Sequence, residues 1–173
     1  ERMIAQGKPF CAHYFDTIRA AFPENLQSAT VDSFYRAINT CKADFIRVEA
    51  DEVTYPLHII LRYEIERGLF DGSMQVDDLP HIWNELMQKY LGIKPTTDTL
   101  GVLQDSHWSG GAFGYFPSYT LGAMYACQFY KTLLNEQPET EANIATGNFS
   151  PIKGWLNEKI HRQGSLYTPQ ELI

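Results

Sequence analysis

The spacing of apolar residues constrains the fold of this chain more than any other feature of its sequence. Apolar side chains recur three and four residues apart, the period of an amphipathic helix, in the segments 10–21, 31–40, 44–68, 78–91 and 117–136. No stretch of any length alternates apolar and polar residues as a strand does, apart from a short extended piece around residues 74–76. The sequence therefore predicts an all-α fold of kinked, irregular helices, forming one helical region over residues 1–173.

Prolines and capping residues set the expected helix ends. Thr30 predicts the start of the helix over 31–40, and Ser150 followed by a proline predicts another helix that ends at Gly164. Pro56 lies inside the segment 44–68, where it predicts a kink near residues 54–55. The expected apolar stripe of that segment is Val53, Leu57, Ile60, Leu61 and Ile65. In the segment 117–136 the expected contact residues are Leu121, Met124, Tyr125, Gln128, Phe129 and Leu133.

The end of the chain carries a further helix start. Thr168, Pro169 and Glu171 form the pattern of an N-cap, a first helical proline and a capping-box partner. Because the sequence stops within the first turn of that helix, we expect the chain to be part of something longer. The alternatives are a short frayed terminus or a boundary chosen for expression.

Composition excludes some classes of function. Of the 173 residues 44% are hydrophobic and 20% charged, which indicates a globular protein. The formal charge of −7 argues against nucleic-acid binding, and no apolar run is long enough to span a membrane. Cys11, Cys41 and Cys127 are odd in number and far apart, which indicates reduced thiols in a cytoplasmic protein.

The stretch 101–122 is the densest in side chains that do chemistry. Gln104, Asp105, His107, Tyr115 and Tyr119 lie there among several glycines. Glycines allow unusual backbone conformations and close approach, and binding groups are often carried on such loops. The stretch is therefore either a functional loop or an aromatic-rich connection between two helices.

A second cluster precedes Pro56. Arg47 and Asp51 are four residues apart, so on a helix they would lie on one face and pair. An arginine held by a carboxylate can present its planar fork to an anionic substrate. The alternative interpretation of this cluster is a solvated helix end.

The sequence lacks a recognisable metal site. It contains no HExxH motif, and the single ExxH pair, Glu158 with His161, falls short of the two pairs that a di-iron bundle needs. From the residues alone, the chain therefore holds an incomplete site.

Two motifs nevertheless resemble those of a known family. Ile46 to Asp51 matches Ile/Met-Arg-x-x-Ala-Asp, and Gly101 to Trp108 matches Gly-x-x-Gln-Asp-x-His-Trp. Together with Tyr55 and the segment 114–122, they resemble the carboxypeptidase Taq family of zinc-dependent carboxypeptidases, metallopeptidase family 32. The similarity runs over the whole chain, but it covers only about the C-terminal third to two fifths of such an enzyme. The family's HExxH motif and its following His-Glu-Ser-Gly/Gln motif, which hold the metal, are absent.

The resemblance implies a role for each matched residue. His107 and Tyr115 would donate hydrogen bonds to the developing oxyanion. Asp105, placed with the substrate-binding residues, would orient His107 or keep it protonated. Arg47 would bind the terminal carboxylate of a peptide substrate. Gln104 and Tyr119 would line the substrate subsites, with packing and loop hydrogen bonding as the alternative for both.

The sequence thus predicts the substrate-side portion of a zinc metallocarboxypeptidase that is inactive by itself. Its Zn²⁺ ligands would lie in the missing N-terminal part of the same enzyme. The resemblance also implies a homodimer, and an apolar face left by missing helices would favour self-association. The alternatives are a non-catalytic helical interaction module derived from such an enzyme and, less well supported, a di-iron bundle.

Overall fold

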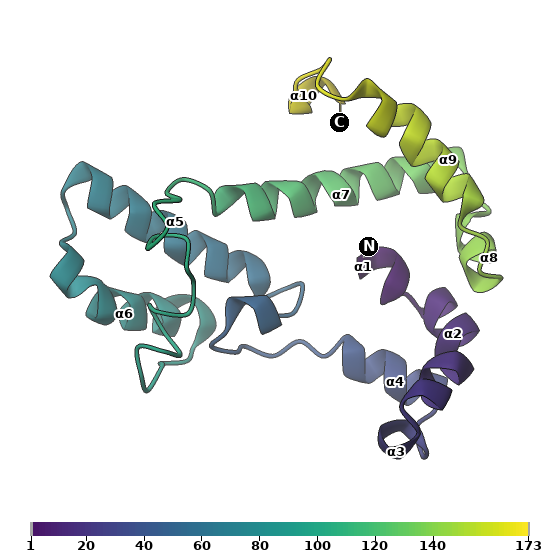
Figure 1. Cartoon of the computed structure of the whole chain (residues 1–173), viewed down its shortest axis with the longest axis horizontal. Helices are drawn as coiled ribbons and strands as arrows, with labels where there is room; N and C mark the ends of the chain where they lie inside the picture. The colour runs from purple at the N-terminus through teal and green to yellow at the C-terminus, as the bar shows by residue number, and fades with distance from the viewer. Residues whose placement is uncertain (1, 173) are drawn as a thin grey trace. The chain divides into compact units, whose positions relative to one another are not determined.

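A computed structural model describes residues 2–172, and every regular element in that range is a helix (Figure 1). The all-α prediction is therefore confirmed. The α-helices are α1 (Arg2–Ala5), α2 (Lys8–Ala21), α3 (Pro23–Leu26), α4 (Val31–Ile38), α5 (Tyr55–Asp71), α6 (Leu79–Leu91), α7 (Pro117–Glu136), α8 (Thr140–Ala145), α9 (Ser150–Lys159) and α10 (Pro169–Leu172). Three short 3₁₀ turns are η1 (Arg47–Glu49), η2 (Val76–Asp78) and η3 (His161–Gln163).

The chain divides into two compact units. Unit 1 comprises the chain up to Asn39 and from Met124 onward, and unit 2 comprises Thr40–Ala123. That the chain forms a single helical region remains a prediction. No helix among residues 2–172 has both the length and the apolar character needed to cross a membrane.

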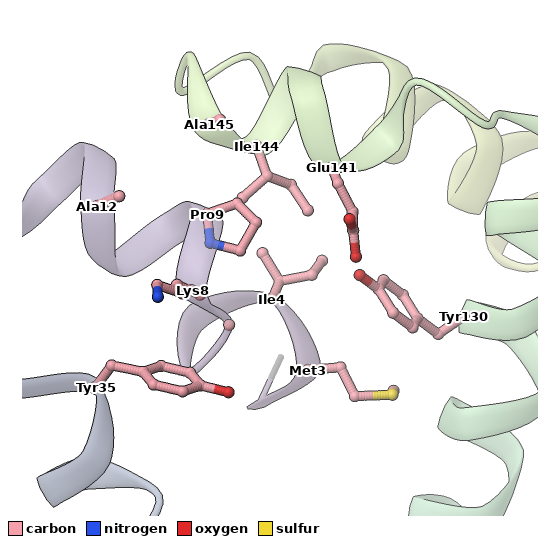
Figure 2. A pocket seen from close by; sticks show the side chains of 11 residues that line it. Met3, Ile4, Lys8, Pro9, Ala12, Tyr35, Tyr130, Glu141, Ile144 and Ala145 are labelled. Carbon is pink, nitrogen blue, oxygen red and sulfur yellow. The ribbon is translucent and has the colours of Figure 1, made fainter. Parts of the chain in front are cut away.

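Unit 1 is built from α2 packed against α4 and α8. Its core comprises Leu133, Ile144, Ile152 and Trp155. An open pocket of about 580 Å³ lies beside this core (Figure 2). In Figure 2 the Tyr130 hydroxyl points toward the Glu141 carboxylate, and burial together with the charge of Glu141 raises the pKa of Tyr130.

Unit 2 is organised by α5 and α6, which run side by side (Figure 1). Leu61, Ile65, Trp83, Met87 and Leu91 form its core, and Trp108 from the following loop packs against them. That loop, residues 92–116, leads back to α7 and carries most of the predicted site.

The prediction of one kinked helix over residues 44–68 is wrong. Residues 44–54 are irregular around η1, and α5 begins at Tyr55 with Pro56 in its first turn. A proline is tolerated there because the first N–H groups of a helix have no partner within the helix. Asp51 stabilises the preceding turn by accepting hydrogen bonds from the backbone N–H groups of Val53 and Thr54.

The predicted apolar stripe of this segment is only partly correct. Leu61 and Ile65 are buried, whereas Val53 and Ile60 are exposed. Val53 precedes the helix, so helical spacing does not govern where it points. In α7, Leu133 is buried as predicted, but Leu121 and Met124 are exposed.

Local capping was predicted more accurately. Thr30 and Ser33 form a capping box at α4, and Glu171 accepts hydrogen bonds from Thr168 at α10. Ser150 is the first residue of α9 rather than its cap, and the Asn148 side chain accepts its N–H. Caps are predictable because they depend on residues only a few positions apart.

Candidate functional site

A carboxylate shared by two arginines lies at the centre of unit 2. One oxygen of Asp105, Oδ1, accepts hydrogen bonds from Arg47 Nε at 3.1 Å and Nη2 at 2.7 Å. The other, Oδ2, accepts from Arg62 Nε at 2.7 Å and lies 2.5 Å from Arg62 Nη2. Arg47 belongs to η1, Arg62 to α5 and Asp105 to the loop after α6, so this one carboxylate joins three separate segments.

Gln104 fixes the backbone around this carboxylate. Its side-chain oxygen accepts the N–H of Arg47 at 2.8 Å, and its amide nitrogen donates to the carbonyls of Phe45 at 2.9 Å and Gly101 at 3.1 Å. The Gln104 amide is therefore engaged with the backbone on both sides, and its place in a substrate subsite remains a prediction.

Aromatic rings surround both guanidinium groups. Arg47 lies 5.0 Å from the ring centroid of Tyr119 and 5.7 Å from that of Phe116. Arg62 lies 4.6 Å from Trp83 and 5.3 Å from Phe116. The negative face of an aromatic ring attracts a cation, so these rings help to stabilise the two buried charges.

The electrostatics of the three ionised groups follow from burial and pairing. Burial lowers the pKa of Arg62 to about 10, against the opposing effect of Asp105. Burial would also lower the pKa of Arg47, but the hydrogen bond and charge of Asp105 outweigh it and raise that pKa. Burial would raise the pKa of Asp105, yet the arginines hold it below its usual range. The trio is therefore ionised at neutral pH and carries a net single positive charge.

His107 lies next to this charged group. Its Nε2 is 3.0 Å from the Tyr119 hydroxyl, and its Nδ1 is 3.8 Å from Asp105 Oδ1. The imidazole packs on Phe116, with 4.4 Å between ring centroids. The Tyr115 ring lies 6.0 Å from that of His107 and 5.3 Å from that of Tyr119, and Tyr115 is 51% exposed. Imidazole and phenol groups thus gather beside the arginine pair.

The predicted site residues are brought together. Within unit 2, hydrogen bonds, ion pairs or ring contacts join Arg47, Gln104, Asp105, His107, Tyr115 and Tyr119 into one cluster. The catalytic and substrate-binding roles assigned to them remain predictions. The prediction that Arg47 pairs with Asp51 is wrong. The 3₁₀ turn η1 is a single turn, so the i, i+4 geometry of an α-helix does not apply there. Asp51 instead caps the turn before α5.

Sequence reasoning missed several residues that hold the cluster in place. Arg62 and Glu66 are buried on α5, and Phe116 is buried beneath His107. A signal for the first two exists in the sequence. His58, Arg62 and Glu66 follow one another at four-residue spacing within an otherwise apolar helix face, and buried polar groups of this kind need partners. His58 is buried as well.

Residues 2–172 contain no group of three or more His, Cys, Asp and Glu side chains placed to hold a metal ion. Three protein ligands and an open position are the usual arrangement of a catalytic zinc site. The described residues of this chain therefore do not fit the ligand set of such a metal.

Comparison with known proteins identifies the family. The family model of the carboxypeptidase Taq (M32) metallopeptidases matches residues 1–173 of this chain. The chain belongs to this family. It is 51% identical over 173 residues to Carboxypeptidase 1 of Bacillus subtilis, covering 100% of this chain and 34% of that protein.

Other family members give the same coverage. Thermostable carboxypeptidase 1 of Thermus thermophilus is 40% identical, again over 100% of this chain and 34% of its own length. A solved structure described as Pyrococcus furiosus Carboxypeptidase Apo-Mg superposes with a TM-score of 0.94 at 41% identity, covering 99% of this chain and 34% of that one. The chain thus spans about a third of the length of these M32 relatives.

The buried His58 predicts a pH-dependent stability. Burial, together with the charges of Arg62 and Arg47, lowers the pKa of His58 from 6.5 to about 4. The folded state thus disfavours the protonated ring, so its stability is complete above pH 6.5 and falls as the pH drops toward 4. The expected loss is roughly 3 kcal/mol, measured by urea denaturation across this range. His58→Gln should remove the loss of stability on acidification. His81→Gln, at an exposed histidine, should retain that loss. An unchanged slope in His58→Gln would contradict this assignment.

Asp105→Asn should strongly destabilise unit 2. The substitution leaves two buried guanidinium groups without the carboxylate between them, a change that typically costs about 3–5 kcal/mol. The matched control is Asp16→Asn, which breaks an exposed pair with Arg19 and should have little effect. Thermal denaturation followed by circular dichroism measures both. Equal melting temperatures for the two variants would show that the Asp105 bridge does not hold the unit together.

Proposed function

We propose that this chain is the substrate-side portion of a zinc-dependent metallocarboxypeptidase, an enzyme that hydrolyses the C-terminal peptide bond of peptides. Family membership supports the class of reaction. The chain spans about a third of the length of its relatives, which supports the view that other parts of the enzyme complete the site. The single observation that carries the substrate-side role is the geometry of Arg47.

Arg47 is held rigidly and still has donors to offer. Its Nε and Nη2 bond Asp105, and its Nη1 donates to the Tyr55 hydroxyl at 2.8 Å. A guanidinium has five N–H groups, so the second N–H of each terminal nitrogen remains for an incoming oxygen. The net positive charge of the arginine pair with Asp105 favours an anion there. A substrate carboxylate fits this requirement in charge and in planar geometry.

His107, Tyr115 and Tyr119 supply hydrogen-bonding groups beside Arg47. A peptide anchored by its terminal carboxylate has its last peptide bond one residue away from the anchor. His107 and Tyr115 are then the donors to the oxyanion that develops at this bond, and each such donor typically contributes about 3 kcal/mol to the transition state. Tyr119 orients His107 through their hydrogen bond, and with Gln104 it borders the subsite.

The alternative is a non-catalytic helical interaction module that kept this surface. The exposed apolar residues of α7, Leu121 and Met124, suit either interpretation, because both require a partner to cover them. Formation of a homodimer and a cytoplasmic location remain predictions. A natural gene that encodes an HExxH motif upstream of Glu1 favours the enzyme, whereas a natural start near Met3 favours the module.

The chain alone should be inactive. We expect it to bind no stoichiometric zinc and to release no amino acid from short peptides, because the proposed metal ligands lie in the other part of the enzyme. Metal analysis of the purified chain and amino-acid release measure these properties. One equivalent of bound zinc would contradict the proposal that the ligands lie elsewhere.

The role of Arg47 is tested in the intact enzyme with paired substrates. One peptide carries a free terminal carboxylate, and the other carries a terminal amide. We expect Arg47→Met to lower kcat/KM for the acid by about 100-fold and to remove most of the preference for the acid over the amide. A loss of folding would lower both rates together, so the ratio isolates recognition of the carboxylate. Arg19→Met, a surface change in unit 1, is the control. An unchanged preference in Arg47→Met would refute the assignment.

A further inference from the structure

The buried carboxylate of Glu66 is bonded to the loop that carries His107 and Tyr115. Glu66 lies on α5, four residues after Arg62, and is 4% exposed. Its Oε1 accepts the indole N–H of Trp108 at 2.8 Å, and its Oε2 accepts the backbone N–H of Gly114 at 3.0 Å. Each carboxylate oxygen therefore holds a different point of the loop.

The two points are the immediate neighbours of the proposed oxyanion donors. Trp108 follows His107 in the sequence, and Gly114 precedes Tyr115. A shift of either neighbour moves the adjacent donor. One side chain of α5 thus bonds the chain beside both donors, whose rings lie 6.0 Å apart.

The loop between these points depends on such external bonds. It contains no regular helix, and its own backbone bonds include Ala112 N–H to the His107 carbonyl at 2.8 Å. Gly111 and Gly114 have φ of 75° and 74°, a conformation that side chains of L-residues rarely adopt. At the first point the Trp108 ring is also packed against Trp83 and Phe116. At the second point Gly114 has no side chain to pack, so its N–H bond to Glu66 restrains it directly, beside the ring contact of the neighbouring Phe113 with Phe70.

We propose that Glu66 is a positioning residue, which sets the alignment of His107 and Tyr115 by anchoring Trp108 and Gly114 to α5. The inference rests on the proposed carboxypeptidase function. Glu66 itself does not touch the substrate, so its removal should disturb the transition state more than substrate binding. Arg47, which is held by Asp105 and Tyr55, should keep its place.

The test uses the intact enzyme and the free-acid peptide. Glu66→Ala removes both acceptors and should lower kcat by about 100-fold with KM within about twofold, since a displaced oxyanion donor costs on this scale. Glu66→Gln keeps one acceptor oxygen and should fall between Glu66→Ala and the unaltered enzyme. Because Trp108→Phe acts through the same carboxylate, the double variant with Glu66→Ala should lose less than the product of the two single losses.

The matched control is a bond of the same kind elsewhere. Glu136 Oε2 accepts the indole N–H of Trp155 at 2.7 Å in unit 1. Glu136→Ala breaks this bond far along the chain from the site loop and should leave kcat unchanged. The inference is overturned if Glu66→Ala retains kcat within twofold, raises KM at unchanged kcat, or loses no more activity than Glu136→Ala.

A second measurement separates this inference from the proposed function. Hydrogen exchange of the Gly114 amide should accelerate at least tenfold in Glu66→Ala and remain unchanged in Glu136→Ala, whatever reaction the enzyme performs. An intact enzyme that releases no terminal residue would refute the proposed function alone. Equal exchange of the Gly114 amide in the two variants would refute the anchoring role of Glu66.

Discussion

The pairing of Asp105 with Arg47 and Arg62 is the interaction on which the rest of unit 2 depends. Charges are costly to bury unless they are paired and hydrogen-bonded. Both arginines are buried, and each directs two nitrogens at one oxygen of the same carboxylate. Because the three residues belong to η1, α5 and the loop after α6, satisfying these charges fixes the relative positions of three segments.

The helix α5 has a polar side as well as an apolar one. Leu61 and Ile65 pack into the core, while Arg62 and Glu66 hold the loop of the site. Arg62 bonds Asp105 before His107, and Glu66 bonds Trp108 after it. A loop with little regular structure is thereby organised from a rigid helix, an arrangement that pre-positions binding groups.

Several features of the fold followed from local sequence rules. Helices α2, α4, α6 and α7 were predicted from apolar spacing and caps, and the candidate site residues were predicted from two short motifs together with the segment 114–122. Two of the failures share one cause. The spacing of Arg47 and Asp51 and the place of Val53 were interpreted as if residues 44–68 were one helix. The helix α5 instead begins at Tyr55, with Pro56 in its first turn, so the residues before it obey no helical period.

The sequence by itself determined most of the helical segments and many of the side chains of the site, because helical periods and caps act over a few residues. Only the tertiary structure decided the partners of those side chains. Asp105 pairs with two arginines that lie 58 and 43 residues away in the sequence. Glu66 bonds the Trp108 indole and the Gly114 N–H, which lie 42 and 48 residues away. No local rule selects such pairs. They form because folding removes these charged groups from water, and each must then bond whichever partner the packed helices bring within reach.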